Sequence, residues 1–215
     1  MSRSYQQYCP VARALEHVGE RWTVLVAREL LLGPRRFTDL MAGLPGVSTN
    51  VLTLRLKELE QAGLVARRDL PPPASSTVYE LTDAAAGLVS VVAAMADWGM
   101  GLLGRPRKRD DLRGSWLVLG LAATVTAPDV ADGTVFELRT DDEVVHARVR
   151  DGHVEPERGP ADDPDAVITA SARTLAAVAR GELTVSRGLA GGRIDIDGDR
   201  TASRRLLEAF VSSAA

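Results

Sequence analysis

The sequence predicts an α+β fold in two parts, and three observations lead to this prediction. Apolar residues recur with helical spacing through residues 11–63, and two apolar-alternating runs flank a Pro-rich tip within residues 64–81. The pattern then changes after a charged, Pro-containing segment at 105–111. Because helices and strands differ in hydrophobic period, these changes locate the elements. We therefore expect one domain at residues 1–104, a linker at 105–111 and a second domain at 112–215.

The bulk composition is typical of a folded globular protein. Of 215 residues, 45% are hydrophobic and 26% are charged, which is enough to build a core. The net charge of −3 gives no overall attraction to nucleic acid, so any DNA-facing surface must be local. The single cysteine, Cys9, excludes an intramolecular disulfide. Without a signal-peptide pattern or a run of about 18 apolar residues, we expect a cytoplasmic protein that does not cross a membrane.

Four short helices are expected at the N-terminal end. The first covers residues 11–18 and stops at Gly19. The second has apolar residues at i, i+3, i+4 and i+8 and ends at the glycine of Gly33-Pro34. The third shows the same spacing from Phe37 to Leu44. The fourth has Ser48 as its N-cap, and its apolar positions, at i, i+4 and i+7, are Leu52, Leu56 and Leu59.

A β-hairpin and a long helix complete the first domain. Residues 64–70 and 77–81 read as strands around a turn-rich tip. Residues 83–103 read as one helix with an apolar face made of Leu88, Val91, Val92, Met95, Trp98 and Leu102. That stripe is longer than a small domain can cover, and burying each large side chain is worth roughly 1.5–3 kcal/mol. We therefore expect a second copy of the chain to cover it.

The second domain reads as a mixture of strands and helices. An apolar helix is expected at residues 112–126. Strands are then expected at 134–140, 143–150, 153–157, 165–170 and 193–197. Helices are expected at 171–179, 186–190 and 201–210. This alternation predicts an α+β unit.

The elements of the first domain, in their order, form a winged helix-turn-helix, which places one helix in the DNA major groove. The outward face of the fourth helix carries the candidate base and phosphate readers Ser48, Thr49, Asn50, Thr53, Leu54 and Lys57. Asn pairs with adenine, Thr offers a hydroxyl and a methyl, and Leu54 suits a thymine methyl. Phosphate-gripping candidates flank this helix: Arg35, Arg36, Thr38, Arg67 and Arg68. The alternative interpretation is an ordinary solvated helix face.

Several of these segments resemble the HxlR family of bacterial winged-helix regulators. They are residues 9–15 (CPVARAL), 19–25 (GERWTVL), 28–40, 44–48, 51–52, 55–65 and 79–82 (YELT). The resemblance spans roughly residues 8–104. It implies a homodimer that binds double-stranded DNA and whose interface is formed by the N-terminal helix and helix 83–103. Leu54 stands where a polar residue is expected, which leaves the base preference of the helix open.

The second domain resembles sterol-carrier-protein-like domains. The resemblance rests on residues 165–170 (DAVITA), Leu175, 178–181 (VARG), 190–199 (AGGRIDIDGD), 206–207 and Phe210, within roughly residues 112–212. It implies a sheet backed by helices around a cavity for a small apolar ligand. The expected lining is Trp116, Leu119, Phe136, Val145 and Ile168. The alternative is an ordinary filled core.

Cys9 suggests regulation by oxidants. Some members of the HxlR family sense oxidants or electrophiles through a cysteine near this position, and the resemblance implies the same redox-sensing role for Cys9. The alternative is that Cys9 is an inert packing residue.

Catalysis and metal binding find little support in the sequence. It contains no Gly-rich phosphate loop, nucleophile elbow or helical His-x-x-x-His pair. His146 and His153 flank a predicted hairpin, where surface histidines are commoner than metal ligands. We predict no enzyme activity, no metal and no cofactor. The main hypothesis is a dimeric transcriptional regulator controlled by an apolar ligand; the alternative is an apolar-ligand carrier whose helical half only dimerises.

Overall fold

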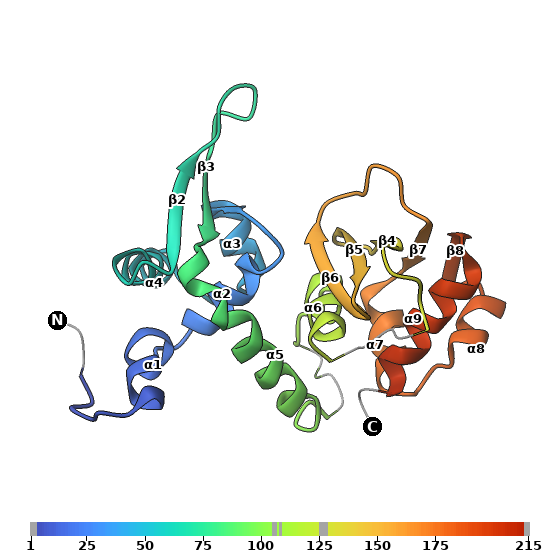
Figure 1. The fold of residues 1–215 in the computed structure, drawn as a ribbon, viewed down its shortest axis with the longest axis horizontal. Helices are drawn as coiled ribbons and strands as arrows, with labels where there is room; N and C mark the ends of the chain where they lie inside the picture. Colours follow the sequence, from blue (N-terminus) through green and yellow to red (C-terminus); the bar gives the residue numbers. More distant parts are fainter. Residues whose placement is uncertain (1–3, 105–106, 108, 125–128, 213–215) are drawn as a thin grey trace. The chain divides into compact units, whose positions relative to one another are not determined.

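The computed structural model describes residues 4–104, 107, 109–124 and 129–212 (Figure 1). The chain divides into two compact units, Met1–Val92 and Ala93–Ala215, and each is described by itself. The linker predicted at 105–111 and the end of the helix predicted at 112–126 lie partly outside the described residues.

The helices of the first unit are α1 (Pro10–Val18), α2 (Thr23–Leu30), α3 (Phe37–Gly43) and α4 (Thr49–Gln61), as the sequence predicts. Pro10 occupies the first turn of α1, where its missing N–H costs nothing. The Ser48 hydroxyl accepts a hydrogen bond from the Val51 amide at the start of α4. Trp22, at the N-cap of α2, has a left-handed backbone conformation that the sequence did not indicate.

A small antiparallel sheet completes this unit. The strands β2 (Val65–Asp69) and β3 (Thr77–Leu81) form the hairpin, and β1 (Arg35–Arg36) adds to it in the order β1-β3-β2. The sequence missed β1, because a two-residue strand has no periodic pattern. A short 3₁₀ turn, η1 (Asp83–Ala85), separates the hairpin from α5 (Gly87–Met100), so the helix predicted at 83–103 is shorter at both ends.

One apolar cluster holds the first unit together. It consists of Val26, Leu30, Leu40, Leu44, Val47, Leu52, Leu56, Leu59 and Val65, all buried. Apart from Val47, which lies between α3 and α4, these residues come from the predicted stripes of α2, α3 and α4 and from β2. The cluster fixes which face of α4 points inward and therefore which face remains outside.

The second unit is a five-stranded sheet with helices. Its helices are α6 (Gly114–Thr124), α7 (Ala172–Ala179), α8 (Val185–Ala190) and α9 (Arg200–Ser212). Its strands are β4 (Val135–Arg139), β5 (Val144–Arg150), β6 (His153–Arg158), β7 (Ala166–Ala170) and β8 (Ile194–Gly198). The order is β6-β5-β4-β7-β8; β4 and β7 are parallel and the other neighbours are antiparallel.

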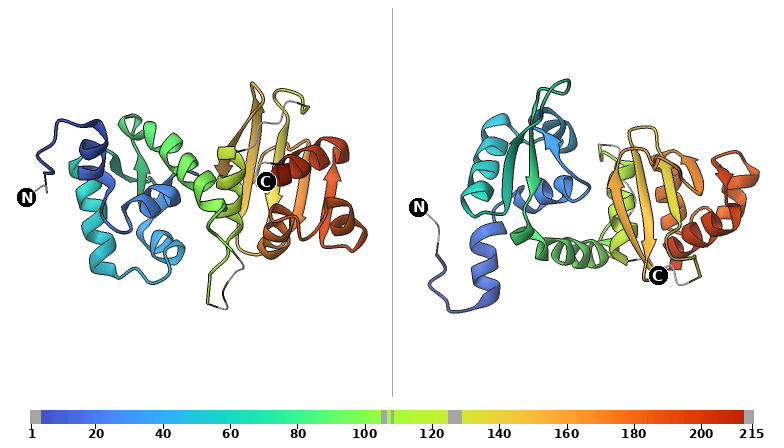
Figure 2. Two further views of the ribbon diagram at one scale, coloured as in Figure 1. Left: turned by 90° about the horizontal axis from the view of Figure 1, so that it is seen from below. Right: turned by 45° about the horizontal axis from the view of Figure 1, so that its top comes forward.

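The inner face of this sheet is apolar and covered by helices. Helix α6 packs against β5 and β6, α9 packs against β7 and β8, and α7 contacts both helices (Figure 2). Alternate residues of β5 are buried, as expected for a strand with one covered face. The central strand β4 is buried on both faces and includes Glu137, whose carboxylate accepts hydrogen bonds from Arg139 Nε at 2.6 Å and from the Ala161 amide at 2.8 Å.

Candidate nucleic-acid interface

Helix α4 has a buried apolar face and an exposed polar face. Leu52, Leu56 and Leu59 are each at most 2% exposed. The predicted readers all lie on the exposed side: Ser48, Thr49, Asn50, Thr53, Leu54 and Lys57. One helix surface therefore presents an amide, hydroxyls, an ammonium group and one apolar side chain, the chemistry that suits base edges and phosphates.

The hairpin beyond α4 carries two neighbouring arginines on opposite faces. Arg67 lies opposite Tyr79 in the strand register and is exposed. Arg68 is also exposed, but two nitrogens of its guanidinium donate hydrogen bonds to the Glu80 carboxylate. Nε lies 3.0 Å from Oε1, and Nη2 lies 2.8 Å from Oε2. The hydrogen bonds from Arg68 lower the pKa of the Glu80 carboxyl group and raise the pKa of Arg68. The sequence did not indicate Glu80, whose pairing depends on the hairpin register.

Arg35 lies inside the first unit and not on its surface. It is 8% exposed, and its Nη1 atom lies 2.6 Å from Oε2 of the buried Glu29. The same Nη1 donates to the Asp39 carbonyl oxygen at 3.2 Å, and Arg28 binds the other Glu29 oxygen at 2.8 Å. A buried and paired guanidinium cannot also bind a phosphate. The phosphate contact predicted for Arg35 is therefore not part of the proposed interface.

The other flanking candidates lie outside. Arg36 and Thr38 are exposed at the start of α3. Arg55 of α4 is paired with carboxylates: it binds Glu58 and lies 3.5 Å from Glu20. Arg55 therefore ties α4 to the turn between α1 and α2.

The apolar faces of α1 and α5 are exposed within the single chain. On α1 these side chains are Val11 and Leu15, and on α5 and the turn after it they are Val91, Met95, Trp98 and Leu102. Trp98 is 70% exposed. Such surfaces in a soluble domain mark interaction sites.

Cys9 lies at the N-cap of α1 as a free, partly exposed thiol. The chain before it folds back on α1, because the Tyr5 amide donates to Glu16 Oε1 at 2.9 Å. This hydrogen bond lowers the pKa of the Glu16 carboxyl group.

In the second unit, three predicted lining residues lie together on the inner face of the sheet. Phe136, Val145 and Ile168 are each at most 2% exposed. Trp116 and Leu119 are half-buried on α6, and the Arg113 guanidinium lies 5.7 Å from the Trp116 ring centre. Helix α6 packs against β5, which carries Val145. Phe136, Val145 and Ile168 thus border the layer between the sheet and its helices, whereas the buried side chains among those described on α6 are Ser115 and Val118.

Neither a metal-binding group nor a membrane-spanning helix occurs in the described part of the chain. Within the described residues, no three His, Cys, Asp or Glu side chains come together in a group that could hold a metal ion. His146 instead contacts the Gly159 carbonyl oxygen at 3.0 Å, and His153 contacts the Asp151 carbonyl oxygen at the same distance. None of the helices described is long and apolar enough to cross a membrane.

Comparison with known proteins matches each half of the chain to a different family model. Residues 17–106 match the HxlR-like helix-turn-helix model, and residues 129–210 match the SCP-2 sterol transfer family. An HTH-type transcriptional regulator of Synechocystis is 37% identical over 94 residues, which are 42% of this chain and 70% of that protein. The regulator YvaP of Bacillus subtilis is 36% identical over 93 residues, 43% of this chain and 86% of YvaP. A solved structure, the reduced form of the B. subtilis regulator YodB, is 32% identical and covers 47% of this chain and 100% of YodB, with a TM-score of 0.40.

Proposed function

The chain belongs to the HxlR-like helix-turn-helix family of transcriptional regulators, and from this premise we propose that it acts as a homodimer on a pseudo-palindromic DNA operator. The observation that carries the proposal is the two-sided character of α4. Its leucines are locked in the core while its polar side chains face outward. A helix held in this way can enter the major groove without losing its own packing.

We assign base reading to Asn50 and Thr53 and phosphate contact to Thr49 and Lys57, all exposed on α4. An amide side chain can pair with adenine through two hydrogen bonds, whereas an ammonium group binds phosphate as a point charge. Leu54 adds an apolar contact that suits a thymine methyl.

The hairpin supplies further contacts to the DNA backbone. Arg67 on the hairpin and Arg36 on the neighbouring strand β1 are exposed and suit phosphate binding. Arg68 reaches the same surface, but DNA must compete with Glu80 for its guanidinium. Because of this ion pair, we expect Arg68 to contribute less to DNA affinity than Arg67 does.

Dimerisation follows from the exposed faces of α1 and α5. Burying a large apolar side chain is worth roughly 1.5–3 kcal/mol, so a face with several such residues favours association. A two-fold dimer would also present two copies of α4 to two half-sites of the operator. Because Cys9 begins α1, its modification would change this interface, and we propose it as a redox-responsive position.

We propose that the second unit holds a small apolar ligand that regulates DNA binding in the cytoplasm, with no catalytic turnover. The match of residues 129–210 to a sterol transfer family supports this role. So does the apolar layer bordered by Phe136, Val145, Ile168 and α6.

The decisive experiment is a gel shift with the full chain on its own upstream intergenic DNA. Competitor DNA of unrelated sequence is added in excess, at low salt and at near-physiological salt. A retained complex at the higher salt is the expected result, because sequence-specific contacts resist both challenges. If competitor DNA abolishes the complex with the upstream DNA, and also any complex with random DNA pools, the result would favour the alternative function, a ligand carrier whose helical half only dimerises.

A further inference from the structure

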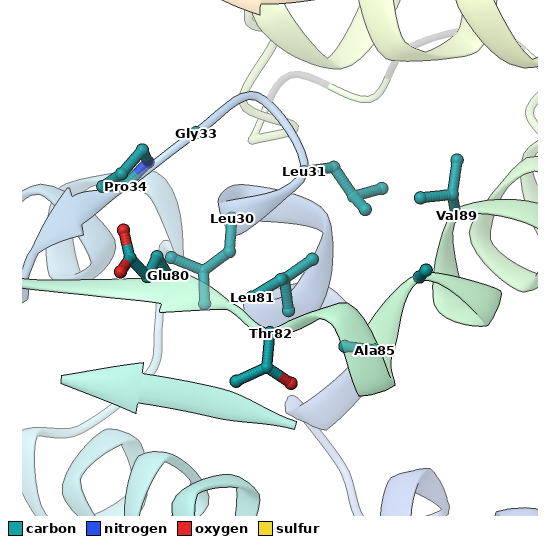
Figure 3. Close-up of a pocket in the computed structure, with 10 residues that line it drawn as sticks. Leu30, Leu31, Gly33, Pro34, Glu80, Leu81, Thr82, Ala85 and Val89 are labelled. Atoms are coloured by element: carbon teal, nitrogen blue, oxygen red, sulfur yellow. The ribbon is translucent and has the colours of Figure 1, made fainter. Parts of the chain in front are cut away.

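A pocket of about 280 Å³ opens within the first unit, where the end of α2, the end of β3 and the start of α5 meet (Figure 3). Its lining residues are Leu30, Leu31, Gly33, Pro34, Glu80, Leu81, Thr82, Ala85, Ala86 and Val89. Neither the predicted DNA surface nor the predicted ligand site of the second unit includes this place. The pocket touches β3, one of the two strands of the hairpin that forms the wing, and α5, the helix assigned to the dimer interface.

The lining is apolar apart from two side chains. The Leu31 and Val89 side chains face each other, and Leu81 and Ala85 lie below them in the view (Figure 3). The Thr82 hydroxyl is committed elsewhere, since it donates to the Gly63 carbonyl oxygen at 2.6 Å. Glu80 is therefore the polar group that remains to orient a ligand, and its charge favours a hydrogen-bond donor over an anion.

The volume sets the size of the ligand. A cavity of about 150 Å³ holds a benzene molecule, so a pocket of about 280 Å³ has room for roughly two fused rings. It is too small for a sterol-sized molecule, which distinguishes it from a site of the kind expected in the second unit.

Glu80 links this pocket to the wing. Its carboxylate accepts hydrogen bonds from Arg68 at 2.8–3.2 Å. A ligand that donates to the same oxygens competes with Arg68 and frees its guanidinium for a phosphate. Occupancy of the pocket would then strengthen DNA binding through charge, without a change in the base readers of α4.

We propose that this pocket is an effector site for a flat, apolar molecule of about two rings that carries a hydrogen-bond donor, and that the effector acts on the wing through Glu80 and Arg68. Ligand binding does not depend on the function proposed above, whereas the effect on DNA affinity rests on it.

The binding test uses 1-aminonaphthalene, a neutral two-ring amine whose fluorescence changes in apolar surroundings, with the full-length protein. Ala86→Leu places a larger side chain in the pocket, and Ala84→Leu makes the same change on a neighbouring exposed residue that does not line it. We expect the wild type and Ala84→Leu to bind the probe alike and Ala86→Leu to bind at least about tenfold more weakly. Equal binding by all three proteins would place the probe elsewhere, for example in the second unit, and would overturn the proposal.

Two controls keep the result interpretable. Thermal unfolding shows whether Ala86→Leu is folded, and Leu31→Ala, which removes one wall of the pocket, gives a second variant that should also bind weakly. Sedimentation measures the dimer fraction of each protein. If the wild type does not bind the probe and Ala86→Leu lowers the dimer fraction, a second copy of the chain fills the pocket and the proposal is wrong.

The regulatory step is tested by linkage. The probe should raise the affinity for upstream DNA by about fivefold or more, and DNA should raise the affinity for the probe by the same factor. Neither change should occur in Ala86→Leu. Probe binding that leaves operator affinity unchanged would refute the effector role. If no specific DNA binding exists at all, the function proposed above fails, while the result for the pocket still stands.

Discussion

The guanidinium of Arg35 and the carboxylate of Glu29 form a buried ion pair, with Nη1 2.6 Å from Oε2. Glu29 lies on α2 and Arg35 on β1, so the pair fastens the loop between them. Removing one partner of a buried pair typically costs about 3–5 kcal/mol when the other charge is left alone, and here Arg28 still binds the other oxygen of Glu29. The two adjacent arginines therefore differ in role: Arg35 is a buried structural residue, whereas Arg36 is exposed.

We expect Arg35→Ala to lower the free energy of unfolding by up to about 3 kcal/mol, because the buried Glu29 would lose one of its two arginine partners. Arg36→Ala is the matched control, since its side chain is exposed, and it should change stability by less than about 0.5 kcal/mol while weakening DNA binding on all sequences. Urea unfolding and gel shifts on both variants measure the two effects. If Arg35→Ala were as stable as the wild type, the structural role would be wrong.

Gly43 packs directly against this ion pair. A Cβ atom at this position would lie 2.3 Å from Glu29 Oε2 and 2.7 Å from Arg35 Nη1. We expect Gly43→Ala to destabilise the first unit, since the buried pair must shift to admit a methyl group. Gly87→Ala is the control, because no atom lies within 4 Å of its added Cβ, and it should be neutral or slightly stabilising. Thermal unfolding of the two variants should separate them clearly; equal melting temperatures would contradict this packing.

Base reading and phosphate binding by α4 make different predictions. Asn50→Ala and Thr53→Ala should reduce the preference for the operator over random DNA by about 1–3 kcal/mol each. Lys57→Ala should weaken the complexes with operator and with random DNA equally. It should also reduce the slope of log affinity against log salt concentration by about 1. Titrations of operator and random DNA at several salt concentrations provide both numbers. Equal losses on all sequences for all three variants would show that the roles are wrongly assigned.

The sequence was sufficient to predict those parts of the structure that depend on the spacing of apolar residues along the chain. The core leucines of α4 follow a helical period, and that period also defines the opposite, exposed face. Strand β5 of the second unit follows in the same way from alternation. For this reason the α+β fold and the outward face of α4 could both be predicted.

What the sequence could not show depends on pairing between distant residues. Arg35 and Arg36 look equivalent in sequence, and only the position of Glu29 decides which is buried. Glu80 reaches Arg68 because of the β2–β3 register. Glu137 is buried because it lies on the central strand and binds the Ala161 amide from the loop after β6. No local period distinguishes such residues from ordinary surface charges.

The Arg68–Glu80 pair predicts a dependence of stability on pH. Hydrogen bonds from Arg68 lower the pKa of Glu80 in the folded state below its ordinary value of 4.5. The unfolded state then binds protons first as the pH falls, so the pair stabilises the fold above about pH 4.5 and its contribution disappears as the pH passes through the lowered pKa. Glu80→Gln should therefore be less stable than the wild type at pH 6, and the difference in stability should be smaller at pH 3. Urea unfolding at both values measures this, and a difference that is constant or grows toward low pH would exclude the pair as its cause.

The exposed face of α5 predicts a dimer that a single charge can break. Trp98 is 70% exposed in the single chain, and placing a carboxylate there would bury a charge in any interface that covers this residue. We expect Trp98→Asp to shift the protein to monomers in sedimentation and to weaken operator binding strongly, because two half-sites no longer act together. Ser90→Asp adds the same charge on the same helix away from the apolar stripe and should leave the dimer intact. A Trp98→Asp variant that remains dimeric would mean that another surface than α5 pairs the two copies of α4, and a monomeric wild type would overturn the proposed dimer.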